Sequence, residues 1–251
     1  MHYMNRVYNL DIDVGFDTMF RLIPNAKENK SSVRGMHNFC GHDKPDIPFV
    51  VCDEDPWDKI KMPGDIIFMT RGILDTLVSL YFHDSHQWKW FSGDIKTFLR
   101  DSNRGVMRYV HYMNAWAPPV YGTEIKRDDG TVLDGGRDRR FCLFKYEDLS
   151  ANPQPVMNVV AEFLKIPFHE EHLRASVDAA SFENMLQQEL RTGIPEHTYD
   201  RNDVNARRVR SGKIGGWKDH LDDDDVEYIC TTLEKELNGF AKQMVEELTL
   251  I

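Results

Sequence analysis

Short runs of apolar, β-favouring residues recur along the chain and predict buried parallel strands. Turn-forming or charged residues bound each run, and the runs are Ile47 to Cys52, Asp65 to Thr70 and Phe141 to Tyr146. Segments with helical periodicity separate or follow them, from Ile73 to Phe82 and from Pro155 to Leu164. Their predicted apolar faces carry Leu74, Leu77, Val78 and Tyr81 in the first, and Val156, Val159, Val160 and Phe163 in the second. This alternation of strand and helix predicts an α/β layered sheet.

Two charged segments add further predictions. Residues Lys126 to Arg140 are charged and glycine-rich, which favours an exposed loop or hairpin. The acidic run Asp222 to Asp225 predicts the start of the last long helix rather than a metal site, because carboxylates cap a helix N-terminus and favour the positive end of its dipole. The buried stripe of that helix is expected to be Leu233, Leu237, Phe240, Met244 and Leu248.

The composition describes a globular chain that can bury a core. Of its 251 residues 41% are hydrophobic, and 31 Lys and Arg stand against 41 Asp and Glu, a net charge of −10. No repeat or low-complexity tract divides the sequence, so we expect one domain over residues 1–251. The acidic balance argues against a surface built for nucleic acid or anionic membrane, because its field repels phosphate. Any anion site must therefore be a local cluster.

Neither a membrane span nor a leader is visible in the sequence. No window approaches the roughly 18 to 20 apolar residues that a span needs, and Met1 to Asp13 lacks the apolar core of a signal peptide. We therefore expect a cytoplasmic protein. The four cysteines are widely spaced without a CxxC pair, which predicts reduced thiols and neither a zinc site nor a disulfide framework; they are Cys40, Cys52, Cys142 and Cys230.

The first candidate site lies where the strand ending at Thr70 turns into the helix from Ile73. Ligands of open parallel sheets sit beyond the carboxyl ends of the strands, and Arg71 is the first residue past that end. Its guanidinium fork suits a phosphate, and the Ser79 hydroxyl, two helical turns on, offers a second ligand. The alternative is a surface pair of Arg71 with Asp75 and an ordinary helix serine.

The second candidate is a basic, glycine-containing segment near the C-terminus. Four cations fall within seven residues, and three glycines lie among or just after them: Arg207, Arg208, Arg210 and Lys213, with Gly212, Gly215 and Gly216. Glycine lets the backbone approach an oxyanion closely, and the cations attract it. The segment therefore predicts an anion-binding loop, with a solvated basic turn as the alternative.

Two further segments, YEDL from Tyr146 and SFENM from Ser181, are weak singly. Together and in this order the four segments resemble the sulfotransferase family that uses 3′-phosphoadenosine 5′-phosphosulfate (PAPS). TRGILDTLVSLYFH is similar to the strand and 3′-phosphate helix of that family, and FKYEDLSANP to its Y-E-D-[ML]-x-x-[DN]-P segment. SFENM is similar to T-S-F-x-x-M, and RVRSGKIGGWKDHL to the closing R-K-G-x-x-G-D-W-K-x-x-[FL]. The resemblance runs from Pro48 to the C-terminus.

This resemblance implies a fold of the P-loop nucleoside triphosphate hydrolase-like superfamily, three-layer α/β/α with a central parallel sheet. It also implies sulfuryl transfer from PAPS to a hydroxyl or amine of a small-molecule or glycan acceptor, without a metal, releasing adenosine 3′,5′-bisphosphate (PAP). The 3′-phosphate would be held by Arg71, Ser79 and Arg210, with main-chain amides from Ser211 and Gly212. The adenine would meet Tyr146 at its edge, with Ser181, Phe182 and Met185 lining or stacking on the ring.

The sequence departs from the family pattern at the phosphate pocket. Gly72, Ile73 and Leu74 stand where a Pro and a basic residue are usual, Ser211 replaces the usual Lys, and Gly216 replaces a common Asp. The resulting pocket has fewer cations than is typical of the family. We therefore expect weakened rather than abolished nucleotide binding.

A larger departure lies before Arg71, where the family carries a loop of the type Y-P-[KR]-[ST]-G-[TS]-x-W that holds the 5′-phosphosulfate. No such element is found in this sequence. Residues sharing a predicted helix face near the start are Tyr3, Met4, Val7 and Tyr8, with no capping residue before them. We expect the chain to begin inside the helix that normally follows the loop. It is then either N-terminally incomplete, which we favour, or a relative that lost the loop.

The general base is also unusual, because the family commonly places a His at the end of the strand preceding the Arg71 strand. Here that strand ends in Asp53 and Glu54. Since burial raises the pKa of a carboxyl group, Glu54, or failing that Asp53, is the candidate base. The alternatives are that these are solvated loop acids, or that His42 swings in.

The acceptor would be lined by the aromatic segments His83 to Phe91 and Trp116 to Tyr121, unless these are ordinary packing. A rival function is a non-catalytic nucleotide-binding or interaction protein that keeps the fold and the 3′-phosphate site. A P-loop kinase is less favoured, because the sequence has no Gly-x-x-x-x-Gly-Lys-[Ser/Thr] and no visible magnesium-binding strand Asp.

Overall fold

The structure is a computed structural model that describes Arg6 and residues 66–120, 125–126, 132–133, 141–163, 167–193 and 198–251. The predicted strand from Ile47 to Cys52 and the helix face that begins at Tyr3 lie outside these residues. The described residues form two compact units. The strand unit comprises 66–81, Gly215–Ile251 and the described part of Phe91–Leu143; the loop unit comprises Phe82–Trp90 and the described part of Phe144–Ile214.

Two of the predicted strands form. β1 (Ile66–Thr70) and β4 (Phe141–Lys145) are neighbours in one sheet. Tyr146, predicted as the last strand residue, instead begins a helix, because Lys145 is the extended N-cap and the acidic first turn suits a helix N-terminus. In the charged segment, β2 (Ile125–Lys126) and β3 (Val132–Leu133) pair antiparallel, which confirms the predicted hairpin.

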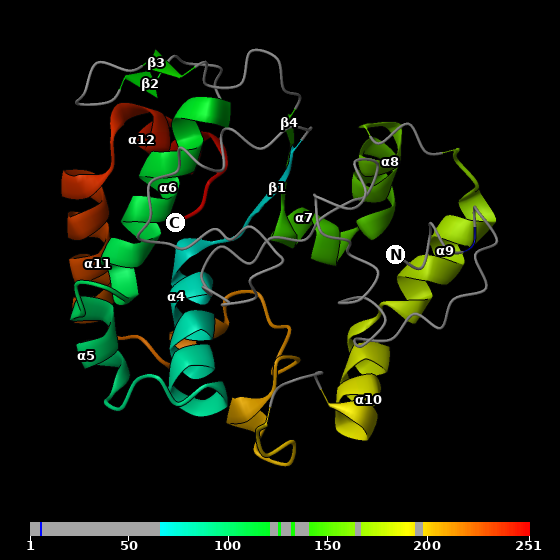
Figure 1. Ribbon diagram of the computed structural model, residues 1–251, viewed down its shortest axis with the longest axis horizontal. Helices are drawn as coiled ribbons and strands as arrows, with labels where there is room; N and C mark the ends of the chain where they lie inside the picture. The colour runs from blue at the N-terminus through cyan, green and yellow to red at the C-terminus, as the bar shows by residue number, and fades with distance from the viewer. Residues whose placement is uncertain are drawn as a thin grey trace. The chain divides into compact units, whose positions relative to one another are not determined.

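The core of the strand unit is built from helices. α4 (Ile73–Phe82) has the predicted bounds and buries Leu74, Leu77 and Val78. The other elements of this unit are α5 (Ile95–Arg100), α6 (Gly105–Val120), η3 (Gly216–Asp219), α11 (Asp223–Glu236) and α12 (Gly239–Glu247). Helix α6 packs against α5, α11 and α12, as Figure 1 shows. The largest buried side chains between them are Phe98, Leu99, Met113, Ile229, Leu233 and Met244, each contributing about 1.5–3 kcal/mol by burial.

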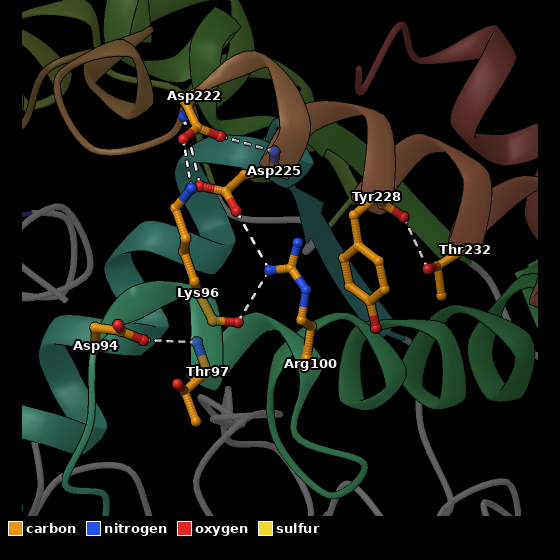
Figure 2. A network of polar contacts seen from close by, with 8 residues as sticks. All are labelled: Asp94, Lys96, Thr97, Arg100, Asp222, Asp225, Tyr228 and Thr232. Atoms are coloured by element: carbon orange, nitrogen blue, oxygen red, sulfur yellow. Dashed lines mark hydrogen bonds and ion pairs between the residues drawn. The ribbon is translucent and has the colours of Figure 1, made fainter.

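A polar network holds α5 to the start of α11 (Figure 2). Asp222 and Asp225 form a capping box at the N-terminus of α11, which confirms the predicted helix start. Lys96 of α5 pairs with Asp222, and Arg100 pairs with the fully buried Asp225 at 3.3 Å while lying 4.5 Å from the ring centre of Tyr228. The hydrogen bond between Lys96 and Asp222 lowers the pKa of the aspartate and raises the pKa of the lysine.

The C-terminal stripe is divided between two helices, so the prediction of one long helix is wrong. Asn238 caps α12 by accepting from the Ala241 amide at 2.9 Å, and its side chain also donates to the Asn114 carbonyl of α6 at 3.1 Å. This contact with α6 stabilises the break at Leu237, whose backbone is extended. The break changes the direction of the chain, so Phe240 leaves the buried stripe and is 36% exposed. Of the other predicted stripe residues, Leu248 is half-buried and Leu233, Leu237 and Met244 are buried.

The loop unit contains η1 (His83–Gln87), α7 (Tyr146–Ala151), α8 (Pro153–Phe163), α9 (Glu170–Ala179), α10 (Phe182–Thr192) and η2 (Val204–Ala206). Helix α8 begins two residues before the predicted start and packs against α9 through a core of Ala161, Leu173, Met157 and Val177. Val160 is buried as predicted, but Val159 is 56% exposed, because the packed stripe of α8 is narrower than its apolar face. Among the described residues, no helix is long and apolar enough to cross a membrane.

Candidate nucleotide-binding site

The basic loop turns at Gly212, in the loop unit, directly against an aromatic ring. The φ of Gly212 is +59°, in the left-handed region that residues with a Cβ rarely adopt. A Cβ at this position would lie 2.6 Å from Cδ2 of Phe182. Only a glycine therefore lets the loop approach the Phe182 ring this closely, and the structure brings together two residues that the sequence assigned to one nucleotide.

Phe182 is placed by the start of α10. Ser181 is the extended N-cap of this helix, and its hydroxyl accepts from the Asn184 amide at 3.3 Å. Met185 lies in the first turn, half-buried, and its amide donates to the Ser181 carbonyl at 2.9 Å. The SFENM segment is thus a helix cap that presents the Phe182 ring at the helix end.

Arg210 lies against a second aromatic residue of the loop unit. Its guanidinium carbon is 4.1 Å from the ring centre of Phe82, a cation–π contact, and the His86 ring lies 5.3 Å from the same ring. The Arg210 side chain is half-buried. A guanidinium can contact a ring and still donate from its N–H groups to an anion, so this contact is compatible with phosphate binding.

The loop offers main-chain donors beside Arg210. Within the part of the chain that the structure describes, the amides of Ser211 and Gly212 donate to no other group, and both residues are exposed. The Ser211 hydroxyl accepts from the Lys213 amide at 3.5 Å. Successive main-chain amides at a turn with positive φ make an anion-binding concavity. Ser211 and Gly212 therefore have the chemistry predicted for phosphate contacts.

The remaining loop cations are not equivalent. Arg207 donates from Nε to the Arg201 carbonyl at 2.7 Å and from its terminal nitrogen to the Asn202 carbonyl at 3.4 Å. These contacts tie Arg207, at the start of the basic loop, to the preceding segment at Arg201 and Asn202. Lys213 is exposed and lies beyond the turn.

A buried carboxylate that the sequence did not single out lies behind the loop. Glu189 of α10 is fully buried. Its Oε1 accepts from the Arg208 amide at 2.8 Å and from the Tyr199 hydroxyl at 2.6 Å, and its Oε2 accepts from the Val209 amide at 2.7 Å. Nothing in the segment LQQEL distinguishes this Glu from a surface residue, because two of its three partners are main-chain amides.

Arg71 and Ser79 belong to the strand unit. Arg71 directly follows β1 and is half-buried, and Ser79 is exposed on α4. The alternative of a surface pair with Asp75 is wrong, because Asp75 is buried and accepts from the Gly215 amide at 2.6 Å and the Trp217 amide at 2.9 Å. The assignment of Arg71 and Ser79 to a phosphate stays a prediction from the motif.

The other predicted site residues are placed less fully. Tyr146 is the first residue of α7 and is half-buried. The candidate bases Glu54 and Asp53, together with His42, lie outside the described residues. Their role stays a prediction.

The two predicted acceptor walls differ. Trp116 is 3% exposed and packs at 5.9 Å on Phe68 of β1, which is core packing. In the loop unit, Trp88 and Trp90 stack at 4.7 Å with 19° between their planes, and Trp90 is 45% exposed. The Trp88 indole donates to Nε2 of His83 at 2.6 Å, which positions this aromatic pair.

Comparison with known proteins identifies the family of this chain. Residues 64–241 match the sulfotransferase domain family. Cytosolic sulfotransferase 10 of Arabidopsis thaliana is 32% identical over 181 residues, 69% of this chain and 50% of that protein. Flavonol 3-sulfotransferase of Flaveria bidentis is 28% identical over 187 residues, 69% of this chain and 55% of that protein. The chain spans about half the length of the curated relatives it matches.

A solved structure of mouse sulfotransferase SULT7A1 complexed with PAP has a TM-score of 0.50 and 17% identity, covering 82% of this chain and 67% of that one. This likeness supports the fold, and it confirms the predicted P-loop-like α/β class. The family match covers the four segments on which the predicted resemblance was based. This chain therefore belongs to the sulfotransferase domain family.

Proposed function

We propose that the chain binds PAPS through its basic loop and transfers the sulfuryl group to a hydroxyl or amine of a small-molecule acceptor. The observation that carries this proposal is the packing of Phe182 on Gly212. It joins the ring assigned to adenine to the loop assigned to the 3′-phosphate. Membership of the sulfotransferase domain family favours this activity over the non-catalytic alternative.

The phosphate end of the nucleotide fits the donors of the loop. Arg210 supplies a cation held on Phe82, and the Ser211 and Gly212 amides supply neutral donors. Charge-assisted hydrogen bonds are stronger than neutral ones, so Arg210 is expected to contribute more to the affinity than either amide. A chain with a net charge of −10 can still hold a bisphosphate here, because short-range contacts outweigh a screened long-range field.

The adenine end fits the start of α10. The Phe182 ring offers a stacking surface, while Ser181, Met185 and Tyr146 are assigned to the base by their positions in the motifs. An aromatic face stacks favourably on a nucleobase. By the same motif-based assignment, Arg71 and Ser79 would contribute to the 3′-phosphate.

The proposed reaction is an in-line displacement at sulfur. The acceptor oxygen or nitrogen forms a bond to sulfur, the bond from sulfur to the 5′-phosphate oxygen breaks, and PAP leaves. A general base takes the acceptor proton, and Glu54 or Asp53 is proposed for this step. No metal enters the proposed reaction.

The exposed Trp90, stacked on Trp88, is the proposed acceptor contact. A planar aromatic acceptor would gain from stacking on such a ring. This proposal agrees with the name of the flavonol 3-sulfotransferase to which the chain is similar.

Isothermal titration calorimetry with PAP tests the proposal on the chain as it exists. Replacing Arg210 with Ala removes a charged hydrogen-bond donor, a loss of about 1.5–3 kcal/mol. We therefore expect PAP to bind the Arg210→Ala variant roughly 10- to 100-fold more weakly than the unaltered chain.

Arg174→Ala is the matched control. Arg174 lies on α9 of the same unit and forms an exposed pair with Glu170 at 3.1 Å, so its removal should leave the PAP dissociation constant unchanged. If the unaltered chain fails to bind PAP at millimolar concentration, or if both variants bind alike, the proposed site is wrong.

A further inference from the structure

We propose that Glu189 is a positioning residue that sets the backbone of the basic loop for phosphate binding. This inference rests on the proposed function and adds a residue that contacts no ligand. Glu189 would act through the main chain of Arg208 and Val209, which directly precede Arg210.

The contacts of Glu189 satisfy both of its carboxylate oxygens. Oε2 accepts from the Val209 amide at 2.7 Å, and Oε1 accepts from the Arg208 amide at 2.8 Å and from the Tyr199 hydroxyl at 2.6 Å. The residue is 0% exposed. A buried carboxylate without partners is strongly disfavoured, so these three donors account for its presence in the interior.

The direction of the two amides matters for the loop. Because the N–H groups of Arg208 and Val209 point back to Glu189, the chain enters the turn with a fixed orientation. Past Arg210, the amides of Ser211 and Gly212 donate to no other group within the described residues. The Glu189 carboxylate thus accepts from the amides of Arg208 and Val209, before the turn. The amides of Ser211 and Gly212, at the turn, remain able to donate to an anion.

The same helix holds both halves of the site. Glu189 lies seven residues after Phe182 on α10, a spacing that returns to nearly the same helix face. At one end of that face the Phe182 ring meets Gly212, and two turns later Glu189 accepts from the Arg208 and Val209 amides before the turn. The loop therefore contacts α10 at two points, Phe182 and Glu189. Displacing either point would misalign the amides with the base-stacking ring.

The test compares PAP binding and loop protection in Glu189→Gln and Tyr199→Phe. In Glu189→Gln an NH₂ group replaces one of the two acceptor oxygens. Two donors then face each other, so the hydrogen bond from the Arg208 or the Val209 amide is lost. We expect the PAP dissociation constant to rise by about tenfold or more. Tyr199→Phe removes a partly buried hydrogen bond to the same carboxylate but leaves both loop amides bound, so PAP affinity should stay within about twofold of the unaltered chain.

Glu183→Gln is the control for charge, because Glu183 lies exposed on the same helix. It should bind PAP as the unaltered chain does. Thermal unfolding of each variant separates a loss of stability from a loss of affinity. If Tyr199→Phe and Glu189→Gln weaken PAP binding equally, the effect is one of general stability and the positioning role is wrong.

Residue-resolved hydrogen exchange on the unaltered chain covers the case in which Glu189→Gln does not fold. The Arg208 and Val209 amides should exchange slowly without ligand, and the Ser211 and Gly212 amides should exchange quickly until PAP slows them. Fast exchange at Arg208 and Val209 would overturn the positioning role while leaving the nucleotide site intact. Absence of PAP binding to the unaltered chain would instead overturn the proposed function, and this inference with it.

Discussion

Gly212 is a residue at which backbone conformation and packing impose the same requirement. Its φ of +59° disfavours a Cβ, and the Phe182 ring occupies the space that a Cβ would need. Gly215 offers a natural comparison, because its φ is +73° and nothing lies within 4 Å of a Cβ placed there. A substitution at Gly215 therefore causes backbone strain alone, whereas one at Gly212 causes strain and a steric clash with Phe182.

We predict that Gly212→Ala weakens PAP binding by about tenfold or more, because the added methyl displaces Phe182 or the turn. Gly215→Ala should lower the free energy of unfolding by about 1–2 kcal/mol, because alanine is strained at a positive φ. It should leave PAP affinity nearly unchanged. Calorimetric titration gives the affinities, and urea unfolding gives the stabilities. Equal loss of PAP affinity in both variants would show that the contact with Phe182 has no functional weight.

Asp75 and Glu189 show why single residues were hard to interpret from the sequence. Each is an isolated acid on a helix, and each is buried because main-chain amides far along the chain bind it. Backbone amides are present at every position except proline, so such a partner leaves no mark in the sequence. The basic and aromatic residues of the motifs, by contrast, could be predicted from the sequence, because the contacts proposed for them are made by their side chains.

At the scale of elements, the contact between α5 and α11 depends on protonation. The pKa of Asp222 is lowered below its ordinary value of 3.8 by the Lys96 hydrogen bond, and the pKa of Lys96 is raised above 10.5 by Asp222. The stabilisation from this pair is therefore present above pH 3.8 and is lost as pH falls through the lowered pKa of Asp222. On the alkaline side it is lost as pH rises through the raised pKa of Lys96.

We predict that Asp222→Asn lowers the Tm slightly at pH 7, because asparagine keeps the helix cap but removes the ion pair. The difference in Tm from the unaltered chain should shrink towards zero as pH falls below the range in which Asp222 is charged. Differential scanning calorimetry from neutral to acidic pH measures it, with the exposed Asp223→Asn as the control. A difference that persists unchanged in acid would assign the effect to the cap and not to the pair.

The helix and strand boundaries were predictable where local sequence and packing agree. Helix α4 and strand β1 follow from an apolar period bounded by polar residues, and the capping box of α11 from its acidic run. The break between α11 and α12 was not predictable, because Asn238 bonds to Asn114 of α6, 124 residues away. The exposure of Val159 was missed for a similar reason, since periodicity does not specify how wide a stripe the neighbouring helix covers.

At the scale of the whole molecule, the basic loop belongs to a chain whose net charge is −10. The net charge of −10 opposes binding of long polyanions, whereas Arg210 and its neighbouring amides act over a short range. Nucleic acid is accordingly not proposed as a partner.

We predict that PAP affinity falls several-fold when salt is raised from about 50 to about 500 mM, because the screening length shrinks from more than about 10 Å to a few ångströms. Adenosine, which has no phosphate, should show no such dependence. Calorimetric titrations at several salt concentrations measure both ligands. A PAP affinity independent of salt would mean that cations of the loop do not contact the phosphates.

The sequence by itself determined the α/β class and the family, and its motifs predicted which residues contact the nucleotide, because periodicity and motif spacing are local properties. Only the tertiary structure decided which of those residues meet. It placed the Phe182 ring on Gly212, stacked Arg210 on Phe82 and buried Trp116 in the core. It also placed the Arg208 and Val209 amides on Glu189, the contacts on which its proposed role rests, and the order of side chains does not encode the direction of main-chain amides.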